Sequence, residues 1–260
     1  MQRLTKKVQK IGNGAHVYLP KELIGQKVTI QPVQKSIPDI KAEALELLKP
    51  YLVHIQGIYL CGSYARGEQS VDSDIDLVVV TDKDITIPAK IREYEIVSGS
   101  VDQIQNTLEH NAISILPMLK ESKVILNESL LYQLQKNKLT KKNVKWYIET
   151  TESSLAIVKD WISDKDKKSI KPIVYSLIMR LRGLYILTSI LHNNEYSNKL
   201  FESMVKKYVT SMGKLYLIYR QHRDSKDVAG EIVEYSDIEK LYSYAFQYYL
   251  KVKKVWEKLT

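Results

Sequence analysis

Apolar and polar residues alternate with different periods in three successive parts of this chain. In residues 1–35, short runs of β-type residues are separated by turn residues such as Gly12 and Gly14, so we expect a small β element. In residues 36–130, apolar runs alternate with amphipathic stretches, which predicts an α/β domain. In residues 131–260, apolar residues recur every three or four positions, which predicts an antiparallel bundle of four helices.

These patterns also predict individual elements. In the first part we expect strands at residues 7–11, 16–19 and 27–30, followed by a proline-containing linker at 31–40. In the second part we expect helices at 40–51 and 106–120 and strands at 55–61, 76–81, 94–105 and 123–126. In the third part, residues 201–219 form one helical stripe, and 173–191 are apolar on more than one face, which predicts the most buried helix.

Charge is distributed unevenly over the three parts. The net charge is +9, but residues 1–35 carry seven basic residues and one acid, residues 36–130 carry eight and fifteen, and residues 131–260 carry twenty-four and fourteen. An acidic centre between basic flanks suits a cation site served by surfaces that attract polyanions. The single cysteine, Cys61, excludes an internal disulfide, and the histidines lack the spacing of zinc ligands. We expect neither export nor a membrane span, and therefore a cytoplasmic protein.

The stretch CGSYARGEQSVDSDIDLVVV, residues 61–80, carries the clearest chemistry. Gly62 and Ser63 follow a predicted strand and open a short helical segment whose free amides can bind an anion. Asp74 and Asp76 stand two apart at the start of an apolar strand, so both side chains leave the same face of the sheet. Buried carboxylates are costly unless a cation compensates them. Carboxylates together with substrate phosphates are the ligands that Mg²⁺ prefers, so we expect a magnesium and nucleotide site here.

This stretch resembles the DNA polymerase β-like nucleotidyltransferase superfamily, whose pattern is h-G-S-x-A-x-G followed by S-D-x-D-h. The resemblance extends over about residues 38–130 and implies a mixed small sheet with flanking helices, two Mg²⁺ ions, and an NTP, with ATP as first choice, as substrate. It implies these roles: Gly62 and Ser63 grip the β- and γ-phosphates, Arg66 lies close to the triphosphate, Ser73 supports the turn, and Asp74 and Asp76 bind metal.

The same resemblance implies a third acid on a later strand beside the first two. Asp102 is our choice as catalytic residue and metal ligand, because it is a lone acid with apolar neighbours in the predicted strand 94–105. Glu93 and Glu95 are its rivals. Asp102 also fits a different interpretation, as a cap before the helix that follows.

Residues 7–25 resemble the AbrB-type swapped-hairpin DNA-binding family, whose pattern reads K-(V/I)-x-K-(I/F)-G-N-(S/G)-x-x-V-x-(L/I/V)-P-K-E-L-x-G. The resemblance implies a homodimer whose basic loops contact DNA, with these lysines at phosphates: Lys6, Lys7, Lys10 and Lys21. A segment this small cannot bury its own apolar faces, so pairing with a second copy is expected on physical grounds as well. The alternative is an arm that only dimerises.

The helical part resembles the bundles that accompany aminoglycoside nucleotidyltransferases and the HEPN partners of minimal nucleotidyltransferases. The R-x4-6-H motif of HEPN ribonucleases is missing, so we expect no ribonuclease activity. The sequence therefore predicts Mg²⁺-dependent transfer of an NMP from an NTP to a hydroxyl of a small molecule, a protein or RNA, with an antitoxin-like role favoured by the AbrB-like arm. The alternative is a non-catalytic, nucleotide-sensing DNA-binding regulator.

Overall fold

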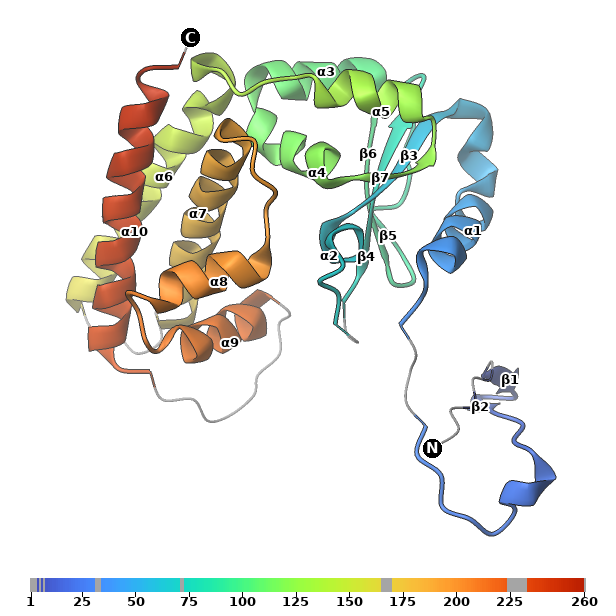
Figure 1. Ribbon diagram of the computed structural model, residues 1–260. Coiled ribbons are helices and arrows are strands. Elements are labelled where there is room, and N and C mark those ends of the chain that lie inside the picture. Colours follow the sequence, from blue (N-terminus) through green and yellow to red (C-terminus); the bar gives the residue numbers. More distant parts are fainter. Residues whose placement is uncertain are drawn as a thin grey trace.

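The computed structural model describes residues 4, 6, 8–30, 34–70, 73–164, 170–223 and 233–259; Lys7, one of the expected DNA contacts, lies outside them. A five-stranded sheet with its helices stands beside a bundle of long helices, and an N-terminal hairpin lies apart from both (Figure 1). This arrangement confirms the expected fold class for the α/β and helical parts.

The sheet is mixed, as expected. Its strands are β3 (Ile55–Cys61), β4 (Ile75–Thr81), β5 (Lys90–Ile91), β6 (Tyr94–Ser100) and β7 (Lys123–Leu126), in the order β5-β6-β4-β3-β7. The central pair β4 and β6 is parallel, whereas the other neighbours are antiparallel. Strand β4 is thus central, and its polar start lies between β3 and β6.

Side chains on β4 alternate between two cores. Ile75, Leu77 and Val79 face the helix α1 (Ile37–Leu47), whereas Val78 and Val80 face the opposite side. That side is covered by α3 (Val101–His110), α4 (Leu116–Glu121) and α5 (Glu128–Gln135). Two short 3₁₀ segments, Lys49–His54 and Ala112–Ser114, complete the connections. Asp76 therefore shares its face of the sheet with the second core.

Two expected boundaries are wrong because capping residues override the apolar pattern. The linker expected at 31–40 ends earlier, since Ser36 caps α1 and Pro38 occupies its first turn. The strand expected at 94–105 stops at Ser100, where Ser100 and Gln103 form a reciprocal capping box that starts α3. As a consequence, the helix expected at 106–120 is divided between α3 and α4.

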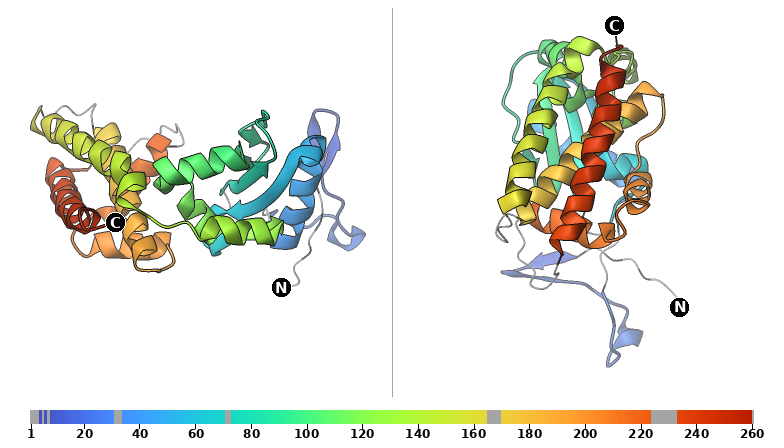
Figure 2. Two further views of the ribbon diagram at one scale, coloured as in Figure 1. Left: turned by 90° about the horizontal axis from the view of Figure 1, so that it is seen from above. Right: turned by 90° about the vertical axis from the view of Figure 1, so that its left-hand side faces the viewer.

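The bundle contains five helices in the described part of the chain, not four. They are α6 (Lys141–Asp164), α7 (Ile170–Leu191), α8 (Asn198–Lys206), α9 (Met212–Arg223) and α10 (Tyr235–Trp256), with the long helices α6, α7 and α10 side by side (Figure 2). The stripe expected as one helix at 201–219 is broken between α8 and α9, because both faces of each short helix meet different neighbours.

Helix α7 is the core of the bundle, as its apolar sequence predicted. Seven of its apolar residues, among them Leu177 and Leu181, are at most 1% exposed. Among the described residues, this is the one helix long and apolar enough by composition to cross a membrane. Its burial between α6, α9 and α10 accounts for that composition.

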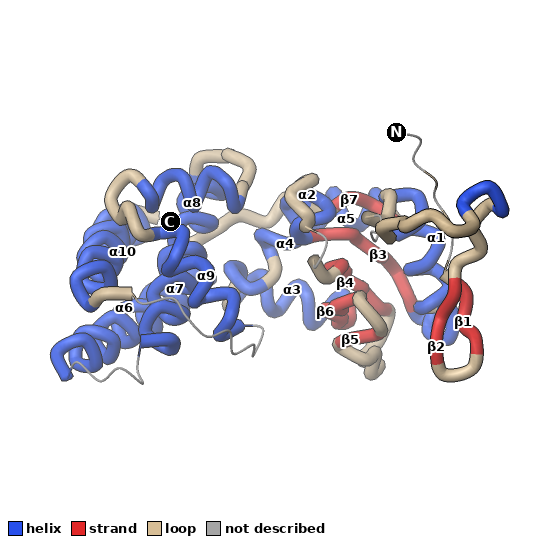
Figure 3. The backbone as a smooth tube through the Cα atoms, turned by 90° about the horizontal axis from the view of Figure 1, so that it is seen from below, coloured by secondary structure: helices blue, strands red, loops and turns tan. Residues whose placement is uncertain are grey.

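One hydrophobic core connects the sheet to the bundle. It extends from Val78 and Val80 through Leu108 of α3 to the residues of α6 and α7. Asn143 of α6 donates to the backbone carbonyl of Leu108 over 2.9 Å, so a polar contact also crosses this junction. The sheet and the bundle are in direct contact through α3 and α6 (Figure 3). A domain boundary at residue 130 would cross this shared core.

The N-terminal element is a two-stranded hairpin of β1 (Gln9–Ile11) and β2 (Gly14–His16), followed by a 3₁₀ turn at Lys21–Leu23. The strand expected at 27–30 is absent from this described segment, because no neighbouring strand is available to pair with it. Large apolar side chains of this element are exposed: Leu4, Val8, Ile11, Tyr18, Leu19, Ile24, Val28 and Ile30.

Candidate active site

Gly62 lies where strand β3 ends and the short helix α2 (Gly62–Arg66) begins. Its φ is +69°, and a Cβ at this position would lie 1.8 Å from Oδ2 of Asp76. A side chain is therefore excluded both by the backbone conformation and by the neighbouring carboxylate. The glycine of the motif is required because Asp76 approaches the backbone of the loop so closely.

Ser73, which the resemblance implies as support for the turn before β4, contacts Ser70 through its side chain and its backbone. Its Oγ accepts a hydrogen bond of 2.8 Å from the amide of Ser70, and its own amide donates to the carbonyl of Ser70. Asp74 follows directly, and Asp76 lies opposite Cys61 of β3. Both carboxylates thus stand at the start of a central strand, beside Gly62 and Ser63.

The third carboxylate is Glu95, not Asp102. Glu95 pairs in parallel register with Asp76, so the two side chains share a face on adjacent strands. The expectation that Asp102 lies on this strand is wrong: it lies in the first turn of α3, beyond the far end of β6. Ser100, the last residue of β6, follows Glu95 by five strand residues, which is a distance of about 16 Å along the strand. Glu93 precedes β6 and pairs with Lys35, which also contacts Glu43 of α1, the helix that covers the other face of the sheet.

We call Asp74, Asp76 and Glu95 the acidic cluster. Burial raises the pKa of Asp76 to about 6, with the negative charges of Glu95 and Glu121 as further causes. A single cation contacts two members of the cluster: Nζ of Lys90 lies 3.1 Å from Oδ1 of Asp74 and 3.3 Å from Oε1 of Glu95. Lys90 is itself exposed, so it compensates these charges only weakly.

The acidic cluster suits Mg²⁺ in its chemistry. All its donors are carboxylate oxygens, and the ammonium of Lys90 shows that a cation fits between Asp74 and Glu95. Within the described ranges, no group of three or more His, Cys, Asp or Glu side chains is close enough together to hold a metal ion. Mg²⁺ commonly binds one or two carboxylates and takes its other ligands from water and substrate phosphates, so a partial protein site is sufficient.

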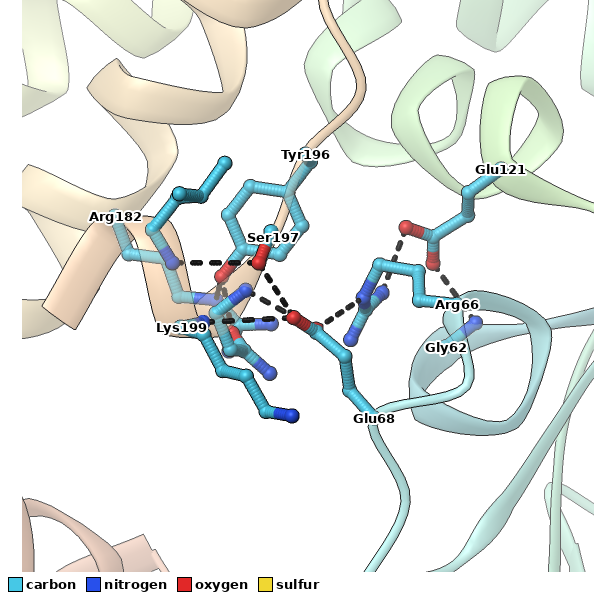
Figure 4. A network of polar contacts seen from close by, with 10 residues as sticks. Gly62, Arg66, Glu68, Glu121, Arg182, Tyr196, Ser197 and Lys199 are labelled. Carbon is cyan, nitrogen blue, oxygen red and sulfur yellow. Dashed lines mark hydrogen bonds and ion pairs between the residues drawn. The ribbon is translucent and has the colours of Figure 1, made fainter. Parts of the chain in front are cut away.

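A second group of charges lies on the other side of Gly62. We call Arg66, Glu68 and Glu121 the Arg66 cluster. Nη1 of Arg66 lies 2.6 Å from Glu121 and its Nε lies 3.0 Å from Glu68, while the Gly62 amide donates to Glu121 over 2.8 Å (Figure 4). The Arg66 side chain is 10% exposed. Arg66, expected beside the triphosphate, is here held by two carboxylates.

The Arg66 cluster also joins the α/β part to the bundle. Glu68 accepts hydrogen bonds from the Ser197 hydroxyl and from the amides of Asn198 and Lys199, at the start of α8 (Figure 4). Burial by itself would raise the pKa of Glu68. The hydrogen bonds from Ser197, Asn198 and Arg66 have the larger combined effect, so the pKa lies below its ordinary value.

Tyr196 stands between two guanidinium groups at this junction. The Arg66 guanidinium lies 5.1 Å from the centre of its ring and that of Arg182 lies 5.4 Å away, while Nε of Arg182 donates to the Tyr196 hydroxyl.

Sequence reasoning missed Glu68 and Glu121 as the partners of Arg66. Glu68 lies inside the quoted motif, but nothing in its spacing shows that it reaches a helix 130 residues later. Glu121 is the last residue of α4, and only the antiparallel pairing of β3 with β7 brings that end of α4 to Gly62. Neither partner leaves a periodic signal in the sequence.

Comparison with known proteins agrees with this geometry. Residues 39–150 match the family model described as "Nucleotidyltransferase domain". This segment includes the acidic cluster, the Arg66 cluster and the first part of α6. This match extends over less than half of the chain. A comparison with curated proteins finds no match.

Three solved structures are similar over much of the chain. A spectinomycin adenyltransferase from Enterococcus faecialis, with ATP and spectinomycin, is 13% identical, with TM-score 0.44, covering 81% of this chain and 97% of that one. A nucleotidyltransferase-like protein from Exiguobacterium sibiricum is 10% identical, with TM-score 0.35, covering 82% and 75%. A toxin-antitoxin structure with AMP-PNP is 19% identical, with TM-score 0.28, covering 46% and 96%.

Proposed function

We propose that this nucleotidyltransferase moves an NMP from an NTP, with ATP as the first candidate, to the hydroxyl of an acceptor in a Mg²⁺-dependent reaction. The observation that carries the proposal is the acidic cluster directly beside Gly62, inside the segment that matches the nucleotidyltransferase domain. Asp74, Asp76 and Glu95 crowd negative charge into a partly buried place that the exposed Lys90 and the nearby Arg66 compensate only in part.

The chain's own residues have distinct roles in this reaction. Asp74, Asp76 and Glu95 would hold Mg²⁺, which supplies charge neutralisation at the phosphates when bound. The Gly62 amide and Ser63 would orient the β- and γ-phosphates. The acceptor oxygen attacks the α-phosphorus, the bond to the bridging oxygen of pyrophosphate breaks, and the hydroxyl proton passes to a carboxylate of the acidic cluster.

The test is incubation of the purified protein with Mg²⁺ and each radiolabelled NTP, following pyrophosphate release and the label attached to protein, RNA or small molecules. We expect turnover that disappears in Asp74→Ala and Asp76→Ala, with unchanged far-UV circular dichroism. The location of the label identifies the acceptor class, for which small molecules, protein hydroxyls and RNA ends remain candidates. Normal turnover by Asp76→Ala would overturn the proposal.

The N-terminal element supports a second, separable proposal. Its exposed apolar residues need a partner surface, and a second copy of the same hairpin is the simplest one, which would give a homodimer. Lys6, Lys10 and Lys21 of the described chain would then lie on a basic surface for DNA phosphates, and Lys7 would join them. In this second proposal the protein is a DNA-binding regulator that senses a nucleotide without turning it over.

Removal of residues 1–35 separates the two proposals. Sedimentation should show a dimer for the full chain and a monomer for the truncated one. Duplex binding that weakens steeply with salt and disappears on truncation, without NTP turnover, would favour the regulator. Turnover that persists in the truncated chain would place catalysis in the remainder and leave the arm a dimerisation or DNA-binding role.

A further inference from the structure

Glu121 occupies two hydrogen-bond donors that the proposed function assigns to the nucleotide. Its Oε1 accepts from the Gly62 amide over 2.8 Å, and its Oε2 accepts from Nη1 of Arg66 over 2.6 Å (Figure 4). The Glu121 side chain is 17% exposed, so this is a partly buried and well-defined contact. A carboxylate bound by an amide and a guanidinium has the same recognition chemistry as a phosphate oxygen pair.

These donors serve one anion at a time. A backbone N–H provides a single donor, and the Gly62 amide is already directed at Glu121. A phosphate that binds this amide must therefore replace the carboxylate or share the hydrogen bond with it. The resemblance of the loop to the nucleotidyltransferase pattern places the β- and γ-phosphates at this amide.

The charges around Gly62 also oppose simultaneous occupancy. Asp76 lies against Gly62, Glu95 pairs with Asp76, and Glu121 adds a further negative charge that raises the pKa of Asp76. A triphosphate would bring several more negative charges into the same partly buried region. Like charges this close are mutually destabilising where solvent screening is weak.

Helix α4 allows the Glu121 side chain to leave. Glu121 is its last residue, and Ser122 already has an extended backbone conformation. A change of the Glu121 rotamer therefore breaks no backbone hydrogen bond inside the helix. The helix is anchored elsewhere, by the buried side chains of Leu116 and Leu119.

We infer that Glu121 is an intramolecular anion that holds the Gly62 amide and Arg66 in place without nucleotide, and that the polyphosphate of an NTP displaces it. The inference rests on the proposed function, because it takes the phosphate-binding role of Gly62 as its premise. Glu121 is a positioning residue that sets nucleotide affinity by competition. Displacement of Glu121 frees Nη1 of Arg66 for phosphate, while Nε of Arg66 remains hydrogen-bonded to Glu68.

Glu68 provides the matched control. It carries the same charge and binds the same arginine, but its other partners are Ser197 and the first amides of α8. Removing its charge relieves some repulsion of a triphosphate and frees Nε of Arg66, yet leaves the Gly62 amide blocked by Glu121. The two glutamates therefore separate a general charge effect from competition at the amide.

The test is calorimetric titration of AMP-PNP with Mg²⁺, and separately of inorganic tripolyphosphate, into the full-length protein and two variants. We expect Glu121→Gln to bind both ligands about tenfold more tightly than the natural chain, and Glu68→Gln to change affinity less than about twofold. Glu121→Asp, whose shorter side chain cannot span both donors, should also bind more tightly, although it keeps the charge. Thermal unfolding of each variant shows that it is folded.

The outcomes distinguish this inference from the proposed function. Equal or weaker binding by both folded Glu121 variants would overturn the inference, since Glu121 would then position Arg66 for the ligand. An equal gain in Glu68→Gln would also overturn it, in favour of general charge relief. Tighter binding without any NMP transfer would support the inference and refute catalysis. Absence of binding by the natural chain and all variants would refute the nucleotide site itself.

Discussion

The acidic cluster and the Arg66 cluster lie on either side of Gly62. Both contain partly buried carboxylates, but the negative charge of these carboxylates is compensated in different ways. The Arg66 cluster surrounds a buried guanidinium with two carboxylates, and the amides of Gly62 and of α8 satisfy the remaining oxygens. The acidic cluster has three carboxylates and one exposed lysine. The first is compensated from within the chain, and the second has a deficit of positive charge.

This difference indicates which cluster takes an external cation. Buried ionised groups are retained when they are paired or hydrogen-bonded, and otherwise their pKa shifts. Glu68 is of the paired and hydrogen-bonded kind, and its pKa is lowered. Asp76 is of the kind whose pKa shifts, because burial and neighbouring negative charge raise its pKa to about 6. The raised pKa thus marks the place where positive charge is missing, which is where the proposed function places Mg²⁺.

The largest expected effect concerns the identity of the third acid. Glu95→Gln should lower turnover by about 10³-fold, because loss of a metal-binding carboxylate removes several kcal/mol of transition-state stabilisation. Asp102→Asn is the matched control, one charge removed in the first turn of α3 beyond the far end of β6, and should stay within about twofold. Pyrophosphate release measures both. The reverse order of effects would restore Asp102 as the catalytic acid.

The next effect is on stability and concerns the Arg66 cluster. Arg66→Met should lower the free energy of unfolding by about 3 kcal/mol, because it leaves Glu68 and Glu121 partly buried without their cation. Urea denaturation at pH 7.5 measures the change. Arg66→Met combined with Glu68→Gln and Glu121→Gln should recover most of the loss. A loss that persists in the triple variant would assign the effect to packing against Tyr196.

Asp76→Asn should raise the free energy of unfolding, in contrast to Arg66→Met. The folded-state pKa of about 6 lies above the ordinary value of 3.8, so the folded protein holds this proton more tightly than the unfolded chain. Stability is therefore lost as pH rises from about 4 to 6, and the ionised group costs about 3 kcal/mol above that window. We expect Asp76→Asn to gain that amount at pH 7.5 and almost nothing at pH 3.5. Urea titrations at the two pH values measure this gain in the free energy of unfolding. A gain of equal size at both pH values would contradict this account.

The smallest expected effect belongs to Lys90. Its contacts with Asp74 and Glu95 are exposed, and exposed ion pairs contribute less than about 1 kcal/mol. Lys90→Met should therefore leave the free energy of unfolding nearly unchanged in 0.15 M salt. Calorimetric titration of Mg²⁺ with AMP-PNP should show affinity unchanged or improved. A strong loss of binding would show that Lys90 contacts the nucleotide.

The sequence predicted the parts of the site that are local in the chain. Gly62 lies at the end of β3, and Ser73, Asp74 and Asp76 lie at the start of β4, so their positions follow from the alternation of side chains and from the turn chemistry. Glu95 was a rival rather than the choice, because the end of β6 is set by the Ser100 and Gln103 capping box, which the apolar neighbours of Asp102 concealed.

Contacts between distant segments could not be predicted in this way. Glu121 and Glu68 depend on how α4 and α8 meet α2, and one sequence shows no signal for such pairings. The same limit applies to the break between α8 and α9, where the apolar stripe continues through two helices of different direction. The strand expected at 27–30 depends on a pairing partner, which a single chain does not supply.

The hydrophobic core that is shared by the sheet and the bundle has a consequence for cooperativity. Because Val78, Leu108 and Leu177 belong to one continuous apolar cluster, opening the bundle exposes the inner face of the sheet to water. The slowest amides of β4 and α7 should therefore exchange with solvent deuterium through the same global unfolding event. Evolution could then change the bundle side chains that face an acceptor, but could not exchange the whole bundle without refolding the catalytic sheet.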